Sequence, residues 1–495
     1  MAHVFGWNVL TPPPPIPCFR DMVNNRHVIS AVMMTPKPSA RKNLEDYIFR
    51  KMGDQGIVGL SVVTVKDGKT DYKRAFGFRN YITGTSATPN TIYCIGSLTK
   101  SFTASAIMQL SEKGLLNLSD PIGKYLPIEL TAMGEPVLIK HLLSHSSGLS
   151  ALGYAEATLT AVTDFSDRWL PISSPEDLMV FMNGADEWAM AKPGERYAYL
   201  NEGYILLGSI IKAVSGMEYA DYIKKNILEP LDMKRSTFHE DDVEKDNDVA
   251  SPYVSSGDNE KVETRYPYGQ MIADGGMMTN VMDMVKFLQM FLSYGQPNGV
   301  KILSEESIKI MMSPKIRTSD IPLNSANNRF YAYGLRIKSE FFGYNLVYHS
   351  GSVFGSSGYM GFIPEKGVGV VIMASGGYFL EDIGELALAQ LLGVNPDDVP
   401  YFKRIEQLES LTGTYTTFRN TSEYEVKRNR GILHLETSFW QRTWTTPLIP
   451  VDLDGDVKRF MVYGLETMTP VEFLWRDGEL LMFYENSLAK RVNGW

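Results

Sequence analysis

The order of β-prone and helical segments limits the folds open to this chain. Residues 58–65 and 72–78 are rich in β-branched and aromatic side chains and flank an Asp-Gly turn, so we expect a hairpin. Residues 330–374 are again β-prone, and residues 380–392 have a helical period. Helices are predicted between these regions, at about 97–113, 138–144, 175–183, 202–226 and 280–293. We therefore predict an α/β domain whose antiparallel sheet takes strands from both ends, with flanking terminal helices and a helical insert at about 115–280.

Proline-rich and polar segments mark the limits of that domain. Four prolines at 12–15 exclude a helix and indicate an N-terminal arm. Residues 393–400 form a polar, proline-marked break, and beyond Leu411 short β-prone runs alternate with Asp-Gly turns. A chain of 495 residues also exceeds one ordinary domain. We predict an arm at 1–38, the α/β domain at 39–393, a linker at 394–410, and an antiparallel β-barrel or half-barrel of a lipocalin-like kind at 411–495.

Composition argues against several classes of partner. The net charge is -9 and no long Lys/Arg run occurs, which argues against nucleic acid as a partner. Two cysteines are too few for a disulfide framework and fit a reducing compartment. The N-terminus lacks a basic segment, and no run of about 18 apolar residues occurs, so we predict neither a signal peptide nor a membrane span. We expect a soluble, cytoplasmic protein without a membrane or nucleic-acid partner.

A serine followed three residues later by a lysine is the first candidate for catalysis. The pattern starts at Ser39, Ser97, Ser209 and Ser487, so it is weak evidence alone. Only Ser97 opens an apolar helix, which puts the Ser97 and Lys100 side chains on one face. The helix N-terminus favours negative charge, the Ser97 N–H can bind an oxyanion, and burial favours the neutral lysine that a base requires. We predict Ser97 as the nucleophile and Lys100 as a proton acceptor.

A Tyr-x-Asn pattern supplies the second candidate element. Tyr199 and Asn201 precede a helical segment, and an extended turn there places the phenol and the amide on one side. Tyr199 can then take part in proton transfer, and Asn201 can bind both Lys100 and a substrate carbonyl. Tyr484 and Asn486 match the same short pattern, so the pattern taken alone more often marks a structural tyrosine.

A His-x-Gly pattern supplies the third element. His349 follows the β-prone residues 344–348, and it alone of the seven histidines has a glycine two residues on. On an edge strand beside Ser97, Gly351 would let a substrate backbone approach closely. The N–H of Ser352 would supply a second oxyanion donor. We therefore predict His349, Gly351 and Ser352 as substrate-binding residues, although a histidine taken alone is more often structural.

Five segments that contain these patterns occur in one order along the chain. They lie at 96–100, 141–149, 193–201, 274–278 and 349–361. Together they resemble the signature blocks of the serine β-lactamase-related and penicillin-binding-protein family. The resemblance covers about residues 40–393, and its Tyr-x-Asn block is similar to the branch of class C β-lactamases, D-alanyl-D-alanine carboxypeptidases, D-aminopeptidases and related esterases. It implies a β-lactamase/transpeptidase-like fold for the α/β domain.

The resemblance also implies a role for each site residue. Ser97 would be the acylated nucleophile, Lys100 and Tyr199 the proton-transfer pair, and Asn201 a ligand of the substrate and of the lysine, with no cofactor or metal. His349 occupies the position of the lysine in the Lys-Thr-Gly block of β-lactamases. A lysine there is a fixed cation, whereas histidine is mostly neutral at pH 7, so we expect a preference for substrates without a free carboxylate.

The resemblance favours a peptidase that acts on short peptides or on peptides with D-residues. A carboxylesterase of the same type is the alternative, and a non-catalytic ligand-binding sensor is a third reading. His141 and His145 have the spacing of a shared metal site but lack a third ligand, and residues 355–359 lack the final glycine of a nucleophile elbow. We further expect a homo-oligomer formed through the N-terminal arm and the C-terminal β domain.

Overall fold

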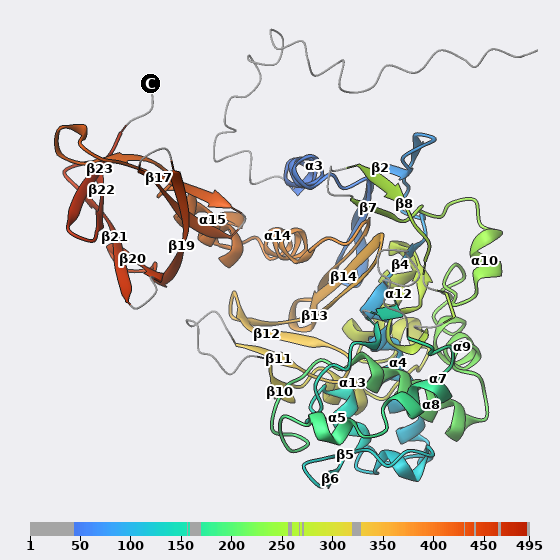
Figure 1. Cartoon of the computed structure of the whole chain (residues 1–495). Coiled ribbons are helices and arrows are strands. Elements are labelled where there is room, and N and C mark those ends of the chain that lie inside the picture. The colour runs from blue at the N-terminus through green and yellow to red at the C-terminus, as the bar shows by residue number, and fades with distance from the viewer. Residues whose placement is uncertain are drawn as a thin grey trace, which may run out of the picture.

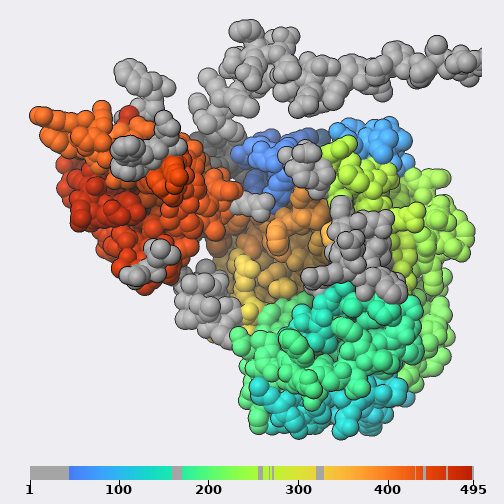
Figure 2. Space-filling view, in the orientation of Figure 1, coloured from blue at the N-terminus to red at the C-terminus, as the bar shows by residue number. Residues whose placement is uncertain are grey.

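The structure is a computed structural model with two parts. It describes residues 44–155, 157–158, 170–255, 260–266, 268–269, 272–318, 328–429, 431–439, 442–463 and 467–492. These residues form an α/β domain and a C-terminal lobe of strands beside it (Figures 1 and 2). The arm predicted at 1–38 lies outside the described residues. Among the residues that are described, no helix is both long and apolar enough to cross a bilayer.

One nine-stranded sheet is the frame of the α/β domain, with the strand order β10-β11-β12-β13-β14-β15-β1-β2-β3. β1 pairs antiparallel with β15, with Val62 opposite Ile372, so the sheet joins strands from both ends of the domain, as predicted. The expected hairpin is formed by β1 and β2. The strands are β1 (Gly59–Lys66), β2 (Lys69–Asn80), β3 (Thr85–Ser86), β10 (Ile316–Arg317), β11 (Arg329–Tyr331), β12 (Arg336–Phe341), β13 (Tyr344–Val353), β14 (Ser356–Ile363) and β15 (Val368–Ser375).

Helices cover both faces of this sheet (Figure 1). Successive side chains of a strand point to opposite faces, so Leu60 and Val62 of β1 join one apolar core, while Val63 and Val65 join the other. The first core includes side chains of α3 (Leu44–Gln55) and α14 (Glu381–Leu391). The second includes side chains of α4 (Thr99–Glu112) and α12 (Val281–Leu292). Each fully buried valine or leucine contributes about 1.5–3 kcal/mol, so the sheet is a rigid support for the segments attached to it.

Short helices fill the middle of the chain, but one predicted helix is interrupted. The helix expected at 202–226 ends as α8 at Gly216, whose φ of 70° forms a left-handed C-cap that a side chain disfavours. α9 follows and continues into a π-helical turn, Lys224–Leu228. The helices of this region are α5 (Ile139–Leu143), α7 (Pro175–Phe181), α8 (Asn201–Ser215), α9 (Tyr219–Ile223), α10 (Glu240–Glu244), α11 (Ile272–Gly275) and α13 (Glu305–Met311). Three small ladders accompany them: β4 (Tyr93–Cys94) with β9 (Met278–Thr279), β5 (Thr131–Ala132) with β6 (Glu135–Pro136), and β7 (Tyr253–Ser255) with β8 (Lys261–Glu263).

The segment predicted as a linker at 394–410 is largely helical. Helix α15 (Pro400–Glu409) begins with Pro400 at its first position, where the missing N–H costs no hydrogen bond. Its Phe402 is buried, and the ring meets that of Tyr47 in α3 edge to face, with the centroids 4.9 Å apart. The connection therefore packs against the α/β domain instead of spanning freely between the two parts.

The C-terminal lobe is a closed antiparallel barrel, which confirms the predicted β domain and excludes the half-barrel. Closure comes from pairing of the first and last strands, with Tyr415 opposite Arg491. The interior is a packed core of apolar side chains, among them the fully buried Phe460 and Phe473. The strands are β16 (Gly413–Thr416), β17 (Glu423–Asn429), β18 (Ile432–Phe439), β19 (Arg442–Asp452), β20 (Val457–Tyr463), β21 (Met468–Arg476), β22 (Glu479–Tyr484) and β23 (Ser487–Arg491).

Candidate active site

Ser97 lies in a 3-10 turn, Gly96–Leu98, and α4 begins at Thr99, two residues after the predicted helix start at about 97. Two glycines let this turn touch strand β13 backbone to backbone. Gly96 has a φ of +52°, and a Cβ there would lie 2.7 Å from the Ser352 nitrogen. A Cβ on Gly351 would lie 2.0 Å from the Ile95 carbonyl oxygen. Any side chain at either glycine would therefore push the nucleophile turn away from the sheet.

Lys100 is fully buried beneath Ser97. Its ammonium donates to three oxygens: Ser97 Oγ at 3.0 Å, Asn201 Oδ1 at 2.8 Å and the Asp274 carbonyl at 2.8 Å. These acceptors match the three N–H bonds of an ammonium group. The Asp274 carboxylate is equally buried, with Oδ2 at 3.9 Å from Lys100 Nζ, and its negative charge offsets the cost of burying the cation. Asp274 lies in one of the five signature segments, but the sequence pattern gave no indication of its role.

Tyr199 and Asn201 lie at the start of α8. Asn201 is the first residue of that helix, which aims its amide oxygen at Lys100. The Tyr199 ring is half-buried, with its centroid 4.9 Å from Lys100 Nζ. Four side chains from distant parts of the sequence, those of Ser97, Lys100, Tyr199 and Asn201, are thus brought together. Their catalytic roles remain predictions.

His349 is buried in β13 and has polar partners within the protein. Its Nδ1 lies 2.7 Å from the Ser350 carbonyl, and its Nε2 lies 2.8 Å from the Tyr331 hydroxyl. A carbonyl can only accept, so Nδ1 donates and Nε2 accepts from Tyr331. Burial and the nearby Arg336 and Lys100 cations hold the pKa of His349 well below its usual value, so the ring is neutral at pH 7. A direct hydrogen bond from His349 to a substrate would require one of these contacts to open.

The position of β13 differs from the predicted edge strand. It lies between β12 and β14, and its register with β12 ends at the pair of Arg336 and Tyr348. β12 therefore covers the edge of β13 that faces away from β14 as far as Tyr348. From His349 onward this edge of β13 is not paired with β12.

The predicted role of Gly351 also changes. The backbone that approaches Gly351 closely is the chain's own Ile95 carbonyl, so the missing side chain makes room for the Ser97 turn. Ser352 follows with an exposed side chain, and its backbone nitrogen faces Gly96 in that same turn. Its use as an oxyanion donor remains a prediction.

The sequence patterns gave no sign of a half-buried cation beside the site, Arg336. The Arg336 Nη2 lies 3.4 Å from the Tyr197 hydroxyl, and the guanidinium carbon lies 5.6 Å from the ring centroids of both Tyr199 and Tyr331. Arginine stays charged at all ordinary pH values and is attracted to aromatic faces. Arg336 and Tyr331 come from short strands without a motif or a diagnostic spacing, so only the fold could reveal them. Besides Lys100, a permanent positive charge near Tyr199 therefore comes from Arg336 and not from residue 349.

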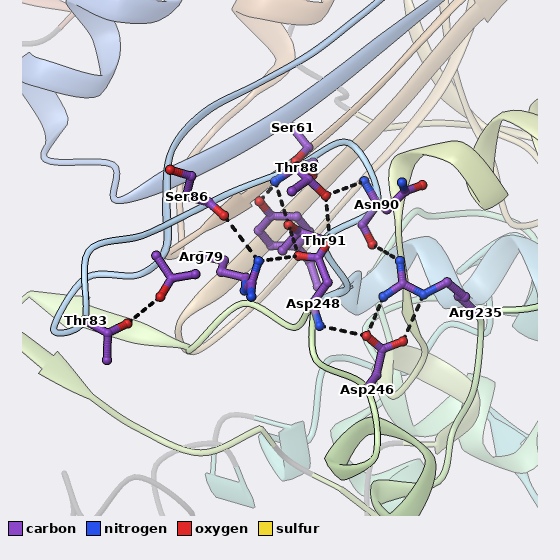
Figure 3. Close-up of polar contacts among 12 residues, drawn as sticks. Ser61, Arg79, Thr83, Ser86, Thr88, Asn90, Thr91, Arg235, Asp246 and Asp248 are labelled. Carbon is purple, nitrogen blue, oxygen red and sulfur yellow. Dashed lines mark hydrogen bonds and ion pairs between the residues drawn. The ribbon is translucent and has the colours of Figure 1, made fainter.

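A polar network holds the chain that leads into Ser97 (Figure 3). The Asp248 carboxylate accepts hydrogen bonds from the hydroxyls of Thr88 at 2.5 Å and Thr91 at 2.6 Å. The N–H of Ile92 donates to the Asp248 carbonyl at 2.8 Å. The segment between β3 and the nucleophile turn is thereby fixed by both the side chain and the backbone of one residue.

Other candidate motifs do not assemble a site. Ser209 lies in the middle of α8, Ser487 lies in a barrel strand, and Ser39 lies outside the described residues. His141 and His145 each use Nδ1 to accept a backbone N–H. In the part of the chain that the structure describes, no group of three or more His, Cys, Asp or Glu is arranged to hold a metal ion.

Comparison with known families matches both parts of the chain. The sequence model described as Beta-lactamase matches residues 44–394. The chain belongs to the beta-lactamase family. A second model, described as Pab87 octamerisation domain, matches residues 396–487, which include nearly all of the barrel.

Individual relatives agree with this assignment. The octameric penicillin-binding protein homologue from Pyrococcus abyssi has 41% identity and a TM-score of 0.83, with 90% of this chain and 99% of that chain covered. A D-stereospecific amidohydrolase from Streptomyces shares the fold at 20% identity and a TM-score of 0.56, with 72% of this chain and all of that chain covered. Protein flp of Staphylococcus aureus strain MW2 is 30% identical over 64% of this chain. The chain spans about 60% of the length of that curated relative.

Proposed function

We propose that this chain is a serine hydrolase that forms an acyl-enzyme on Ser97 and cleaves short peptides. The observation that carries the proposal is the 3.0 Å contact between Lys100 Nζ and Ser97 Oγ at a fully buried lysine. Burying a lysine charge costs free energy, which a site that only holds a ligand has no need to spend. Membership of the beta-lactamase family supports the same class of reaction.

Acylation would begin with attack of Ser97 Oγ on the substrate carbonyl carbon. The serine proton passes to the relay of Lys100 and Tyr199, and the same relay protonates the leaving amine as its bond to the acyl carbon breaks. The resting ammonium of Lys100 must first release one proton to solvent, and the resulting amine then accepts the proton of Ser97. Water then attacks the Ser97 ester, which releases the acid and restores the serine. Such proton transfer typically contributes about 10²–10⁴-fold in rate.

The N–H groups of Ser97 and Ser352 are the proposed donors to the developing oxyanion. The close packing of Gly96 and Gly351 supports this assignment, because it brings the nucleophile turn onto β13 next to Ser352. Donors of this kind are typically worth about 10²–10³-fold in kcat each.

The proposed substrate charge differs from the expectation drawn from His349 alone. That expectation rested on the absence of a fixed cation, but the Arg336 guanidinium lies 5.6 Å from the Tyr199 ring. We therefore propose that peptides with a free carboxylate near the scissile bond are accepted. His349 would contribute through its hydrogen bond with Tyr331 and not through charge.

Assembly through the C-terminal barrel is part of the proposal. The barrel matches a domain described as an octamerisation domain, and the 41% identical homologue is octameric. Tyr463 and Met468 are opposite each other on β20 and β21, and they are 62% and 57% exposed. Such a pair of exposed apolar side chains favours contact with a second subunit. A role of the arm at 1–38 in assembly and a location in the cytoplasm remain predictions.

A matched panel of substrates tests the proposed activity. It contains peptide p-nitroanilides and p-nitrophenyl esters, each with L- or D-residues and with or without a free carboxylate. We expect hydrolysis of amides, including carboxylate-bearing and D-residue ones. Cleavage of esters alone would make the protein an esterase. If no compound is cleaved and a fluorophosphonate leaves Ser97 unmodified, the pocket only binds a ligand.

A further inference from the structure

His145 occupies a strained position beneath the proposed site. It follows α5, is 1% exposed and has a φ of +52°, a left-handed conformation that a bulky side chain rarely adopts. Such strain persists only where surrounding contacts determine it, and it is frequent at functional sites. The contacts of His145 therefore indicate what the strained conformation achieves.

His145 accepts two hydrogen bonds from the backbone N–H groups of the residues on either side of Tyr199 in the sequence. The N–H of Ala198 donates to the His145 carbonyl at 2.9 Å, and the N–H of Leu200 donates to His145 Nδ1 at 3.0 Å. One residue thus binds the backbone immediately before and immediately after Tyr199. This double contact fixes the peptide group that follows Tyr199 and the peptide group that precedes Ala198.

The imidazole ring also packs directly on the Tyr199 ring. The two centroids are 4.0 Å apart at an interplanar angle of 33°, and the rings of Tyr204 and Tyr331 lie at 5.0 Å and 4.6 Å. Burial and the nearby cations hold the pKa of His145 well below its usual value, so the ring stays neutral and Nδ1 stays an acceptor. His145 therefore limits both the backbone and the ring of Tyr199.

We propose that His145 is a positioning residue that holds the Tyr199 phenol in line with Lys100 and Ser97. The inference rests on the proposed function, in which Tyr199 carries protons. It accounts for the left-handed backbone, since that turn presents the carbonyl and the ring of one residue to both neighbours of Tyr199. His145 does not touch the substrate and transfers no proton.

Three substitutions separate the parts of this role. His145→Phe keeps a ring but loses the acceptor for Leu200, so kcat should fall about 100-fold, as expected for misplacement of a catalytic group by about 1 Å. His145→Asn retains an acceptor and tolerates the positive φ, so kcat should return to within about 10-fold of the wild type. His145→Gly removes the ring without backbone strain and should match His145→Phe, which carries the test if the phenylalanine variant does not fold. KM should change little in all three, because substrate contacts are intact.

His141→Asn is the matched control. His141 also accepts a backbone N–H through Nδ1, from Leu138 at 3.2 Å, and among the described residues no hydrogen bond or ring contact joins it to Tyr199. Its replacement should leave kcat unchanged, and circular dichroism should show native folding of every variant compared.

A double-mutant cycle with Tyr199→Phe decides between positioning and general structural support. Without the phenol, His145→Phe should cost less than about 3-fold in kcat, because groups that act as a unit are not additive. An unchanged 100-fold loss in that background, or wild-type kcat in folded His145→Phe and His145→Gly, would overturn the inference. The Ser97→Ala variant keeps the two proposals apart. If Ser97→Ala retains full activity, the proposed function itself is wrong. If Ser97→Ala is inactive but the His145 variants have wild-type kcat, only the role of His145 is wrong.

Discussion

The interiors of the two parts of this molecule differ in kind. The α/β domain buries charged groups, including Lys100 with Asp274 in the site and Lys338 with Glu385 between β12 and α14. In the described residues of the barrel, no Asp, Glu, Lys, Arg, His, Asn, Gln, Ser or Thr side chain is buried. The barrel core is apolar and aromatic, as a core built for packing alone would be.

This difference indicates that the α/β domain, and not the barrel, holds groups whose burial lowers stability but serves a reaction. Buried ions are costly and weak sources of stability, so their retention in one domain fits a site that uses charge. The barrel instead leaves apolar side chains such as Tyr463 and Met468 on its outer surface, which favours contact with another subunit.

The largest expected effect is on chemistry in the α/β domain. Ser97→Ala should lower kcat/KM by about 10⁴–10⁶-fold, because it removes the nucleophile. Ser97 is only half-buried, so the free energy of unfolding should change by less than about 1 kcal/mol. Steady-state kinetics and urea denaturation measure the two quantities. Near wild-type activity would mean that the nucleophile lies elsewhere.

The next effect is on stability. Asp274→Asn leaves the buried Lys100 without its counter-charge, so the α/β domain should lose about 3–5 kcal/mol in its free energy of unfolding. The control is Glu479→Gln in the barrel, where the partner Lys490 is 59% exposed and the pair should be worth less than about 1 kcal/mol. Urea denaturation compares them, and equal losses would abolish the contrast between buried and exposed charge.

A pH dependence should follow from the buried histidines. The pKa values of His145 and His349 lie well below 6.5, and burial lowers that of His141 to about 4. Below pH 6.5 the unfolded chain binds protons that these native side chains reject, so stability is full above that pH and is lost as the pH falls. The expected slope is about 1.4 kcal/mol per pH unit for each histidine.

Hydrogen exchange measured by mass spectrometry can locate this loss. Between pH 7 and pH 5, after correction for the intrinsic rate, peptides of the α/β domain should lose protection earlier than peptides of the barrel. Loss that begins in the barrel would contradict the assignment of the sensitivity to buried histidines.

The smallest effect on activity is expected at the barrel surface. Replacing both Tyr463 and Met468 with arginine should lower the mass of the assembly in light scattering, because the charges oppose burial in a subunit contact. Activity per subunit should stay within about 2-fold. Val180→Arg, at a 77% exposed position of α7, is the control and should leave the mass unchanged. An unchanged mass in the double variant would place the subunit contact elsewhere.

Local patterns predicted the frame of this fold and part of its site. The β-branched run of β1 and the apolar helix after Ser97 are signals that neighbouring residues create, so the sheet with strands from both ends and the Ser97 and Lys100 contact were accessible. Arg336 and Asp274 were not, because their importance comes from contacts between strands and helices that are distant in sequence. The helical character of 400–409 was hidden by the two prolines of the predicted break, Pro396 and Pro400.

His349 shows the same limit at a single residue. Its neutral state followed from the side-chain type, but its burial against Tyr331 and the presence of Arg336 nearby depend on the pairing of β11, β12 and β13. The sequence pattern selected residue 349, whose role in substrate binding stays a prediction. The positive charge beside Tyr199 comes from Arg336 on another strand.

Trapping of the acyl-enzyme tests the central claim most directly. The protein is mixed with a p-nitrophenyl ester of a short acyl peptide, quenched in acid during turnover, and analysed by intact and peptide mass spectrometry. The account predicts one added acyl group per chain, located on the peptide that contains Ser97, and no such adduct in Ser97→Ala. An adduct on another residue, or turnover without any adduct at Ser97 under conditions where deacylation is rate-limiting, would contradict it.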